Sequence, residues 1–209
     1  MICFAHISVL NLENAIRGAR NPLSSWEKSD SFYNDDGEFI FGDADLNLAC
    51  RLAKAGSDHR KFIRQIFVSV DISAPLYWGK EFDTYKVGTV ANSTSTMHKI
   101  HSKPISVDDF SVDHLTDPSA KFFDIIVDYL ESVRLEYMET KDKALWYDLI
   151  QILPESYNQT RTVTMNYENL VNMYHARKNH KLDEWHTFCD EFVLKLPYAK
   201  ELIVIKDEE

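Results

Sequence analysis

The amino-acid sequence predicts one α/β domain of the α+β kind over residues 1–209, with a small sheet and several long helices. The stretch Phe67–Ser73 alternates apolar and polar residues, which is the period of a half-buried strand. The second half of the chain instead repeats apolar residues at the spacing of amphipathic helices. Hydrophobic residues make up 44% of the chain, with only 6 Gly and 6 Pro, so we expect a packed core without long linkers.

The first half of the chain contains short predicted elements separated by turn signals. Proline disfavours helix at the preceding residue, so Asn21-Pro22 ends the first helix. Asp43 or Asp45 is expected to cap the second helix, and Asp58 the third. The predicted elements are a strand at Cys3–Val9, a helix at Leu12–Arg20, a long ordered loop at Leu23–Gly42, a helix ending at Ala55, a short helix before Phe67, a strand broken by Pro75, and an aromatic-rich helix at Leu76–Tyr85.

The second half is predicted to be mostly helical. Apolar residues recur at helical spacing in Lys121–Met138 and in Lys141–Leu153, and Pro154 stops the latter helix. Asn166 and Asp183 are the expected N-caps of two further helices. No internal repeat is visible, which favours one domain over an array.

The bulk composition excludes several classes of function. A net charge of −10 argues against general nucleic-acid binding, which needs a basic surface, although a local basic pocket for one phosphate stays compatible with it. The three cysteines are far apart and lack C-x-x-C spacing, as in a reduced cytoplasmic protein. No run reaches the about 18 apolar residues that a membrane span needs, so no membrane association is expected.

The most function-like stretch is Trp78–Lys99, which contains a run of hydroxyl side chains. Ser93, Thr94, Ser95 and Thr96 follow Asn92 in a segment with few apolar side chains. Hydroxyls and unpaired backbone N–H groups suit a phosphate or a ribose. An exposed Ser/Thr turn has the same composition and is the more common explanation of such a pattern.

Two further polar clusters carry weaker signals. The segment HRKFIRQ places Arg60 and Arg64 on one helix face, where like charges repel unless carboxylates or an anionic ligand meet them. Asn169 and Asn172 share a face of the helix that follows Asn166, and amides there either read the edge of a flavin or pyrimidine or act as caps.

Other chemistries find little support in the sequence. The pair His98-x-x-His101 has no cysteine or clear acidic ligand beside it, so no metal site is predicted. The chain also lacks the G-x-S-x-G elbow, the P-loop and the G-x-G-x-x-G fingerprint. An ordinary hydrolase, kinase or Rossmann oxidoreductase is therefore not expected.

From about Leu12 to Leu202, the order of these segments resembles the flavin-dependent thymidylate synthase family, known as ThyX. The segment AIRGARNP is similar to the family's A-x-R-x-A-R-x-S, and K-A-G at Lys54–Gly56 precedes His59, at the place of a flavin-contacting histidine. VSVDISAP looks like the family strand that ends in A-P. Counted on from Pro75 without gaps, the family signature R-H-R-x-x-S-x-N-E-x-S-x-R-Y falls on Thr84-Tyr85-Lys86, Thr89 and Asn92–Met97.

The C-terminal half continues the resemblance but also departs from it. In ILPESYNQTRTVTMNYENLVNMYHARKNHKLDEW the matching positions are Asn166, Leu170, Asn172, Arg177 and Trp185. Arginines of the family pattern are replaced by Thr96, Ile150 and Glu168, and a flavin-contacting serine by Pro22; only Lys86 keeps a cation among the first three signature positions. Arg60, Lys61, Arg64 and Arg161 are candidates to supply the lost charge from new positions.

The resemblance implies a thymidylate synthase-complementing-protein-like fold, a cytoplasmic homotetramer and a methyltransferase of thymidylate biosynthesis. That activity uses FAD, NADPH and methylenetetrahydrofolate to transfer a one-carbon unit to C5 of dUMP or a related pyrimidine nucleotide. By resemblance, the catalytic residues are Thr94 and Arg177, and the cofactor-binding residues are Arg20, His59, Thr84, Tyr85, Lys86, Asn166 and Asn172. The substrate-binding residues are Glu81, Asn92, Ser93, Thr94, Ser95, Thr96 and Arg177.

Two alternatives to this activity stay open. The replaced arginines, with the hydroxyl-rich segment retained, also suit a non-catalytic or altered-specificity protein that sequesters or senses a nucleotide. A third possibility is an interaction protein in which Trp26, Phe32 and Tyr33 of the early loop form an interface.

Overall fold

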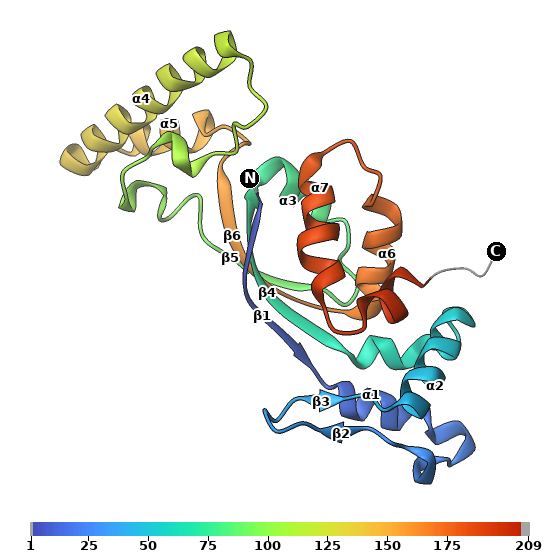
Figure 1. Ribbon diagram of the computed structural model, residues 1–209. Helices are drawn as coiled ribbons and strands as arrows, with labels where there is room; N and C mark the ends of the chain where they lie inside the picture. The colour runs from blue at the N-terminus through green and yellow to red at the C-terminus, as the bar shows by residue number, and fades with distance from the viewer. Residues whose placement is uncertain (1, 206–209) are drawn as a thin grey trace. The chain divides into compact units, whose positions relative to one another are not determined.

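The computed structural model describes residues 2–205 and shows a mixed α/β fold, which confirms the predicted class (Figure 1). The strands are β1 (Cys3–Leu10), β2 (Phe32–Tyr33), β3 (Phe39–Ile40), β4 (Phe67–Pro75), β5 (Val90–Ser93) and β6 (Asn158–Asn166). The α-helices are α1 (Leu12–Ala19), α2 (Asp43–Lys54), α3 (Leu76–Phe82), α4 (Asp117–Thr140), α5 (Lys143–Ile152), α6 (Tyr167–Arg177) and α7 (Asp183–Thr187). None of the helices within residues 2–205 is both long and apolar enough to cross a membrane.

A four-stranded sheet has the order β1-β4-β6-β5, so β6 is an inner strand and β5 lies at an edge. The alternation predicted for β4 is confirmed, because Val68, Val70 and Ile72 are buried while the residues between them are not. The strand β6 was not predicted. Its inward residues Val163 and Met165 alternate with threonines, which have a high preference for strands.

Contacts within the chain divide it into two compact units, whose boundaries fall near or within the strands of the sheet. The first unit comprises Met1–Ala5, Asp71–Thr84 and Ala91–Thr162. The second comprises His6–Val70, Tyr85–Val90 and Val163–Glu209. The single domain expected from the sequence stays a prediction.

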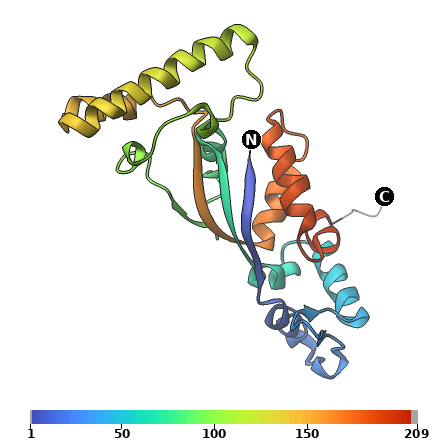
Figure 2. The ribbon, with the colours of Figure 1, turned by 60° about the vertical axis from the view of Figure 1, so that its left-hand side comes forward.

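In the first unit, α4 and α5 form an antiparallel helical pair over a small core (Figure 2). Lys141 takes a left-handed conformation between the helices, with φ 58°, and Asp142 caps α5 by accepting a hydrogen bond from the Ala144 N–H at 2.9 Å. Phe110 packs edge-on against Phe123 and Tyr157, with ring centroids 5.1 and 5.5 Å away. Both predicted helices are therefore present, and α4 begins four residues earlier than expected.

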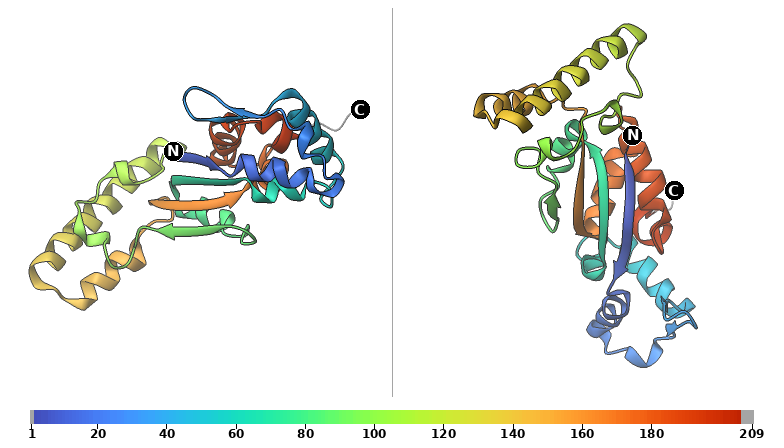
Figure 3. Two further views of the ribbon diagram at one scale, coloured as in Figure 1. Left: turned by 90° about the horizontal axis from the view of Figure 1, so that it is seen from below. Right: turned by 90° about the vertical axis from the view of Figure 1, so that its left-hand side faces the viewer.

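In the second unit, α1, α2 and the β2–β3 hairpin lie together (Figure 3, blue to cyan). The hairpin lies in the segment predicted as a loop. Its turn depends on Asn34, whose side-chain oxygen accepts the N–H groups of Asp36 and Glu38, and on Gly37 at φ +78°. Asn166 caps α6 as predicted, through a capping box with Asn169. The cap predicted at Asp183 is wrong, because Leu182 is the N-cap of α7 and Asp183 is its first residue.

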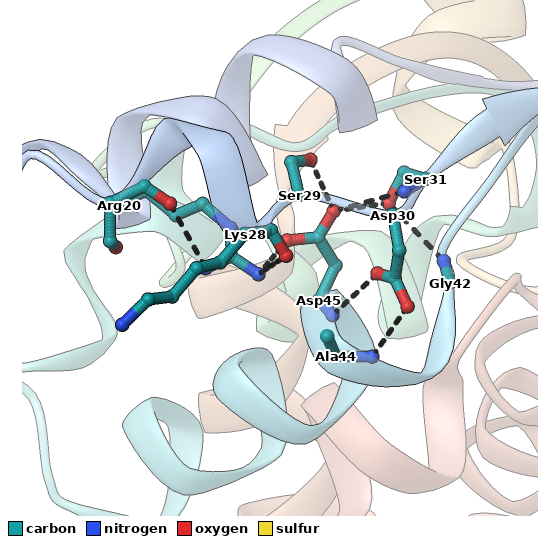
Figure 4. Close-up of polar contacts among 9 residues, drawn as sticks. Arg20, Lys28, Ser29, Asp30, Ser31, Gly42, Ala44 and Asp45 are labelled. Carbon is teal, nitrogen blue, oxygen red and sulfur yellow. Dashed lines mark hydrogen bonds and ion pairs between the residues drawn. The ribbon is translucent and has the colours of Figure 1, made fainter.

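A buried ion pair joins the end of α1 to the start of α2 (Figure 4). The Arg20 guanidinium donates to the Asp45 carboxylate at 2.6 Å and to the carbonyls of Ser25 and Lys28 at 3.3 and 3.0 Å. Arg20 is 5% exposed and Asp45 is fully buried. The hydroxyls of Ser29 and Ser31 also donate to Asp45. The carboxylate therefore binds both the end of α1 and the segment that connects α1 to α2.

The capping prediction for α2 is wrong in its detail. The N-cap residue is Gly42 and has no side chain, so neither Asp43 nor Asp45 caps the helix. Asp30 accepts the N–H groups of Ala44 and Asp45 at 2.8 and 3.0 Å instead (Figure 4). A Cβ at Gly42 would overlap Asp30, which explains the glycine. Asp58 likewise does not cap the next helix, a 3₁₀ segment at Arg60–Gln65 that begins after His59.

The pKa of Asp45 is lower than that of an ordinary aspartate. Burial by itself raises the pKa, but hydrogen bonds from Ser29, Ser31 and Arg20, together with the charge of Arg20, outweigh that effect. The ionised carboxylate is therefore the form that the fold requires.

We expect Asp45→Asn to lower the free energy of unfolding by about 3–5 kcal/mol, because it leaves the Arg20 guanidinium buried without a counter-charge. Urea denaturation of both proteins measures the difference. Asp36→Asn, at an exposed position of the hairpin, is the control and should change stability by less than about 0.5 kcal/mol. Equal stability of Asp45→Asn and the parent protein would contradict the role given to the pair.

The same carboxylate makes stability depend on pH with a defined sign. A lowered folded pKa means that the contribution of Asp45 is complete above its unfolded pKa of about 3.9 and is lost as the pH falls through the folded value. The stability difference between the parent protein and Asp45→Asn should therefore shrink between about pH 5 and pH 2. A difference that is constant over this range would show that Asp45 does not titrate as described.

Candidate functional site

The residues predicted for the site are distributed over both units. Arg20, His59, Tyr85, Lys86, Asn166, Asn172 and Arg177 belong to the second unit, and Glu81, Thr84, Asn92, Ser93, Thr94, Ser95 and Thr96 to the first.

Two aromatic side chains hold Arg177, at the end of α6, in the second unit. Its Nε–H donates to the Tyr85 hydroxyl at 2.8 Å. The centre of the guanidinium lies 5.5 Å from the centroid of the Tyr85 ring and 5.0 Å from that of Trp185. Trp185 is fully buried and meets Tyr85 edge-on at 6.1 Å. The structure thus brings two predicted site residues, Tyr85 and Arg177, into direct contact.

The loop Tyr85–Val90 is fixed onto the start of α6. The side chain of Asn169 donates to the Val87 carbonyl at 2.5 Å. Gly88 has φ +76°, and a Cβ there would lie 3.0 Å from the Asn166 amide nitrogen and 3.1 Å from the Asn169 oxygen. The loop therefore approaches the two asparagines so closely that only glycine fits without displacement.

The asparagine cluster acts first as a helix cap. The side-chain oxygens of Asn166 and Asn169 each accept the other residue's backbone N–H at 3.0 Å. This is the capping alternative that the sequence left open, and it accounts for the oxygen of Asn166 while its amide nitrogen lies next to Gly88. Asn172 is exposed on the same helix.

The hydroxyl of Thr89 is buried in this loop without a hydrogen-bond partner among the described residues. A buried hydroxyl without a partner carries a desolvation cost, and such groups often mark a place where a ligand or water binds. Thr89 stands at a hydroxyl position of the family signature, so the buried hydroxyl without a partner belongs to the segment that resembles the signature.

His59 lines a cavity of about 380 Å³ together with the segment that follows Arg20. Leu48, Leu52 and Phe62 give it apolar walls, and Lys61 contributes a cation. Asn21 and Pro22 are distant from His59 in the sequence but line the same cavity. Two separate segments of the resemblance, A-R-N-P and His59, thus meet at one place in the second unit.

The candidate compensating arginines are largely bound by the protein's own acceptors. Arg60 forms a two-pronged pair with Glu168, with N–O distances of 2.9 Å, and the two side chains are 19% and 13% exposed. In the first unit, Arg161 donates to Asp83 at 2.7 Å and to Gln159 at 3.0 Å. Arg64 donates to the Ser57 carbonyl at 3.2 Å. Within residues 2–205 no hydrogen bond or ion pair engages the Lys61 amine.

Arg20 is also fully engaged in the second unit. Its guanidinium serves the Asp45 cluster and is almost completely buried, so little of its surface remains for a cofactor. The sequence pattern around Arg20 marks a structural residue next to the cavity of His59.

In the first unit, the hydroxyl-rich segment begins on the edge strand β5. Asn92, Ser93 and Thr94 are exposed, and the backbone of Thr94 pairs with β6 through its N–H, which donates to the Thr160 carbonyl at 2.9 Å. Ser95 accepts the N–H groups of Met97 and His98 at 3.3 and 2.9 Å, so it closes a Ser/Thr turn.

The remaining predicted residues lie around this segment. Ser95, Thr96 and Glu81 are half-buried, whereas Thr84 is exposed and donates from its hydroxyl to the Glu81 carbonyl at 2.7 Å. Lys86 is exposed in the second unit. Within residues 2–205 there is no group of three or more His, Cys, Asp or Glu side chains arranged to hold a metal ion.

A further cavity was not predicted from the sequence. It has a volume of about 810 Å³ and lies in the second unit between the end of β1, the β2–β3 hairpin and the segment Lys195–Tyr198. Tyr33 lines it and donates to the Glu13 carboxylate at 2.7 Å, an interaction that raises the pKa of Tyr33. The signal available in the sequence was the group of early-loop aromatics, which had suggested an interface.

The fold is shared with solved structures of nucleotide-modifying proteins. No protein-family model matches the chain, and no curated protein sequence matches it with significance. Two structures of the flavin-dependent thymidylate synthase ThyX from Helicobacter pylori, both with FAD and dUMP, match with TM-scores of 0.69. Their identities to the chain are 20% and 19%; the matches cover 97% of this chain and 97% and 96% of theirs. The chain has the ThyX fold.

A second kind of protein has a similar structure. The UMP/dUMP methylase PolB from Streptomyces cacaoi, bound with 5-Br dUMP, matches with a TM-score of 0.62 and 13% identity, over 96% of this chain and 91% of PolB. The fold expected from the sequence resemblance is therefore confirmed. Because all three identities are low, the ThyX fold is the property these matches establish.

We expect Gly88→Ala to destabilise the protein more than Gly37→Ala, although both glycines have nearly the same φ, +76° and +78°. The left-handed conformation costs each alanine about 1–2 kcal/mol. Only at Gly88 does the new Cβ meet other atoms, Asn166 and Asn169, whereas nothing lies within 4 Å at Gly37. The additional loss at Gly88 should be about 1 kcal/mol in urea denaturation. Equal losses would show that the loop does not rest on α6 as described.

Proposed function

We propose that this protein is a ThyX-like methyltransferase that transfers a one-carbon unit to C5 of dUMP or a related pyrimidine nucleotide. The proposal rests on one observation: Arg177, which matches the family pattern, contacts Tyr85 and Trp185 in a chain with the ThyX fold. A fold alone does not determine a reaction, so the argument depends on what these side chains can do.

The cavity of His59 fits part of a flavin. Its apolar walls suit a planar ring. Lys61 and Asp58 are the charged side chains of the lining, and the Lys61 amine suits the negative charge of a phosphate. Thr89, with its buried and unpaired hydroxyl, offers a further donor in the second unit. Bound FAD would supply hydride transfer with NADPH as the reductant, and methylenetetrahydrofolate would supply the carbon unit.

The roles proposed for the substrate-binding residues follow from their chemistry. Negative charge develops on the pyrimidine ring when C5 becomes nucleophilic, and the Arg177 guanidinium is suited to stabilise it. The exposed hydroxyl of Thr94 and the amine of Lys86 are suited to the ring and the phosphate. Within the first unit, the substrate-binding residues proposed from the resemblance are Asn92, Ser93, Ser95, Thr96 and Glu81. Arg20 is proposed to position the flavin cavity, and Asn166 and Asn172 to border it.

One observation favours a second candidate, a nucleotide-binding protein that sequesters or senses its ligand without catalysis. Arg60 is paired with Glu168 and Arg161 with Asp83, so these cations are already neutralised within the chain. Each missing charge-assisted contact to a nucleotide phosphate costs about 1.5–3 kcal/mol.

We also propose, from the resemblance, a cytoplasmic homotetramer.

We expect the purified protein to bind FAD, with the visible absorbance of a bound flavin, and Lys61→Ala to weaken this binding about tenfold through the loss of one cation in the cavity. Titration followed by absorbance and fluorescence measures both affinities. The matched control is Lys121→Ala, which removes an exposed lysine of α4 in the first unit. Absence of FAD binding by the parent protein would contradict the flavoenzyme proposal.

Turnover separates the two candidate functions. With FAD, NADPH and methylenetetrahydrofolate, mass spectrometry should detect a methylated product from dUMP or UMP, and Arg177→Ala should lower kcat about 100-fold or more. A nucleotide that raises the melting temperature without any product would instead support the sequestering or sensing candidate. No stabilisation by any pyrimidine nucleotide would contradict both.

A further inference from the structure

The contact between Tyr85 and Arg177 constrains a side chain that is otherwise flexible. The Arg177 Nε–H donates to the Tyr85 hydroxyl oxygen at 2.8 Å, which is a short distance for a nitrogen donor. Arginine has several rotatable bonds, and holding its guanidinium in one place costs conformational entropy. A hydrogen bond at Nε fixes the direction in which the remaining guanidinium N–H groups point.

Two ring contacts constrain the position of the same group. The guanidinium centre lies 5.0 Å from the Trp185 ring centroid and 5.5 Å from the Tyr85 centroid, within the range of cation–π attraction. The two rings are inclined at 70° to each other, so together they border the cation on two sides. The hydrogen bond at Nε and the two rings therefore both restrict the guanidinium.

The two aromatic residues are themselves held in place. Trp185 is fully buried and packs edge-on against Phe188 at 5.4 Å. Tyr85 begins the loop that Asn169 and Gly88 fix onto α6. Because α6 also carries Arg177, the loop anchor and the guanidinium belong to one rigid element.

We propose that Tyr85 is a positioning residue that orients the Arg177 guanidinium toward the nucleotide, with Trp185 as the supporting ring. This inference rests on the proposed function. Tyr85 stands where the family signature has histidine, so the rewritten position has a specific use: its ring and its hydroxyl act together on one cation. The change at this position is then an adaptation of the site around Arg177.

The kinetic test is Tyr85→Phe, which keeps the ring and removes the hydrogen-bond acceptor. We expect kcat for methylation to fall about tenfold, with KM for the nucleotide changed less than twofold, because orientation matters most when charge develops on the ring. Tyr85→His, which retains a ring and an acceptor nitrogen, should recover part of the loss. Tyr147→Phe, at an exposed tyrosine of α5, is the control. Unchanged kcat in Tyr85→Phe would overturn the proposal.

A spectroscopic test separates this inference from the proposed function. In ¹⁵N NMR of the parent protein, the Arg177 Nε–H should exchange slowly with water and show a ring-current shift, and Tyr85→Phe should remove the protection from exchange. Arg177→Lys assigns the signal. If this occurs while no nucleotide is methylated, the positioning contact stands and the methyltransferase function fails. An Nε–H signal that is identical in Tyr85→Phe and the parent protein would sink the inference whatever the activity.

Discussion

The buried pair of Arg20 and Asp45 is the constraint on which the second unit depends. Asp45 occupies the first turn of α2 and receives Arg20 from the end of α1, while Ser29 and Ser31 bring the connecting segment to the same carboxylate. Asn21 and Pro22 follow Arg20 directly and line the cavity of His59. Removal of either charge would leave the other buried without a counter-charge, so the position of the cavity wall depends on the pair. This interaction explains why an arginine that resembles a cofactor-binding residue is retained although its own surface is almost inaccessible.

A second constraint acts on the rewritten signature. Gly88 lets the loop lie against the capping box of α6, and the amide of Asn169 holds it there through the Val87 carbonyl. The loop then delivers Tyr85 to Arg177 at the far end of the same helix. Helix capping, loop position and guanidinium orientation are thus consequences of one short stretch of sequence. From the sequence, these asparagines could either cap the helix or bind a ligand. The structure shows the capping role, and the position of Arg177 follows from it.

The sequence predicted regular elements well where local periodicity was strong. The alternation in β4 and the helical spacing in α4 and α5 depend on burial of one face, which a sequence records directly. The strand β6 was missed because its threonines read as a polar segment, although Val163 and Met165 point to the core. The cap of α2 could not be found locally, since its acceptor, Asp30, comes from a segment that precedes the helix by more than ten residues. The partners of Arg60 and Arg161 were equally non-local, because Glu168 and Asp83 are distant in sequence.

The charge arrangement decides how the departures from the ThyX pattern should be understood. The resemblance to the ThyX family expects an arginine where this chain has Glu168. The structure places Arg60 against Glu168 with two short hydrogen bonds, so the carboxylate is matched by a cation from another position. Glu168 is 13% exposed and its charge is neutralised by Arg60. Arg60 therefore cannot replace the lost arginine toward a ligand without exposing Glu168 to the same ligand as an uncompensated negative charge. In the proposed flavin site, compensation then falls to Lys61, which lines the His59 cavity and has no hydrogen bond or ion pair among residues 2–205. A lysine there offers a point charge rather than a planar fork, which favours recognition of a phosphate group over recognition of a ring edge.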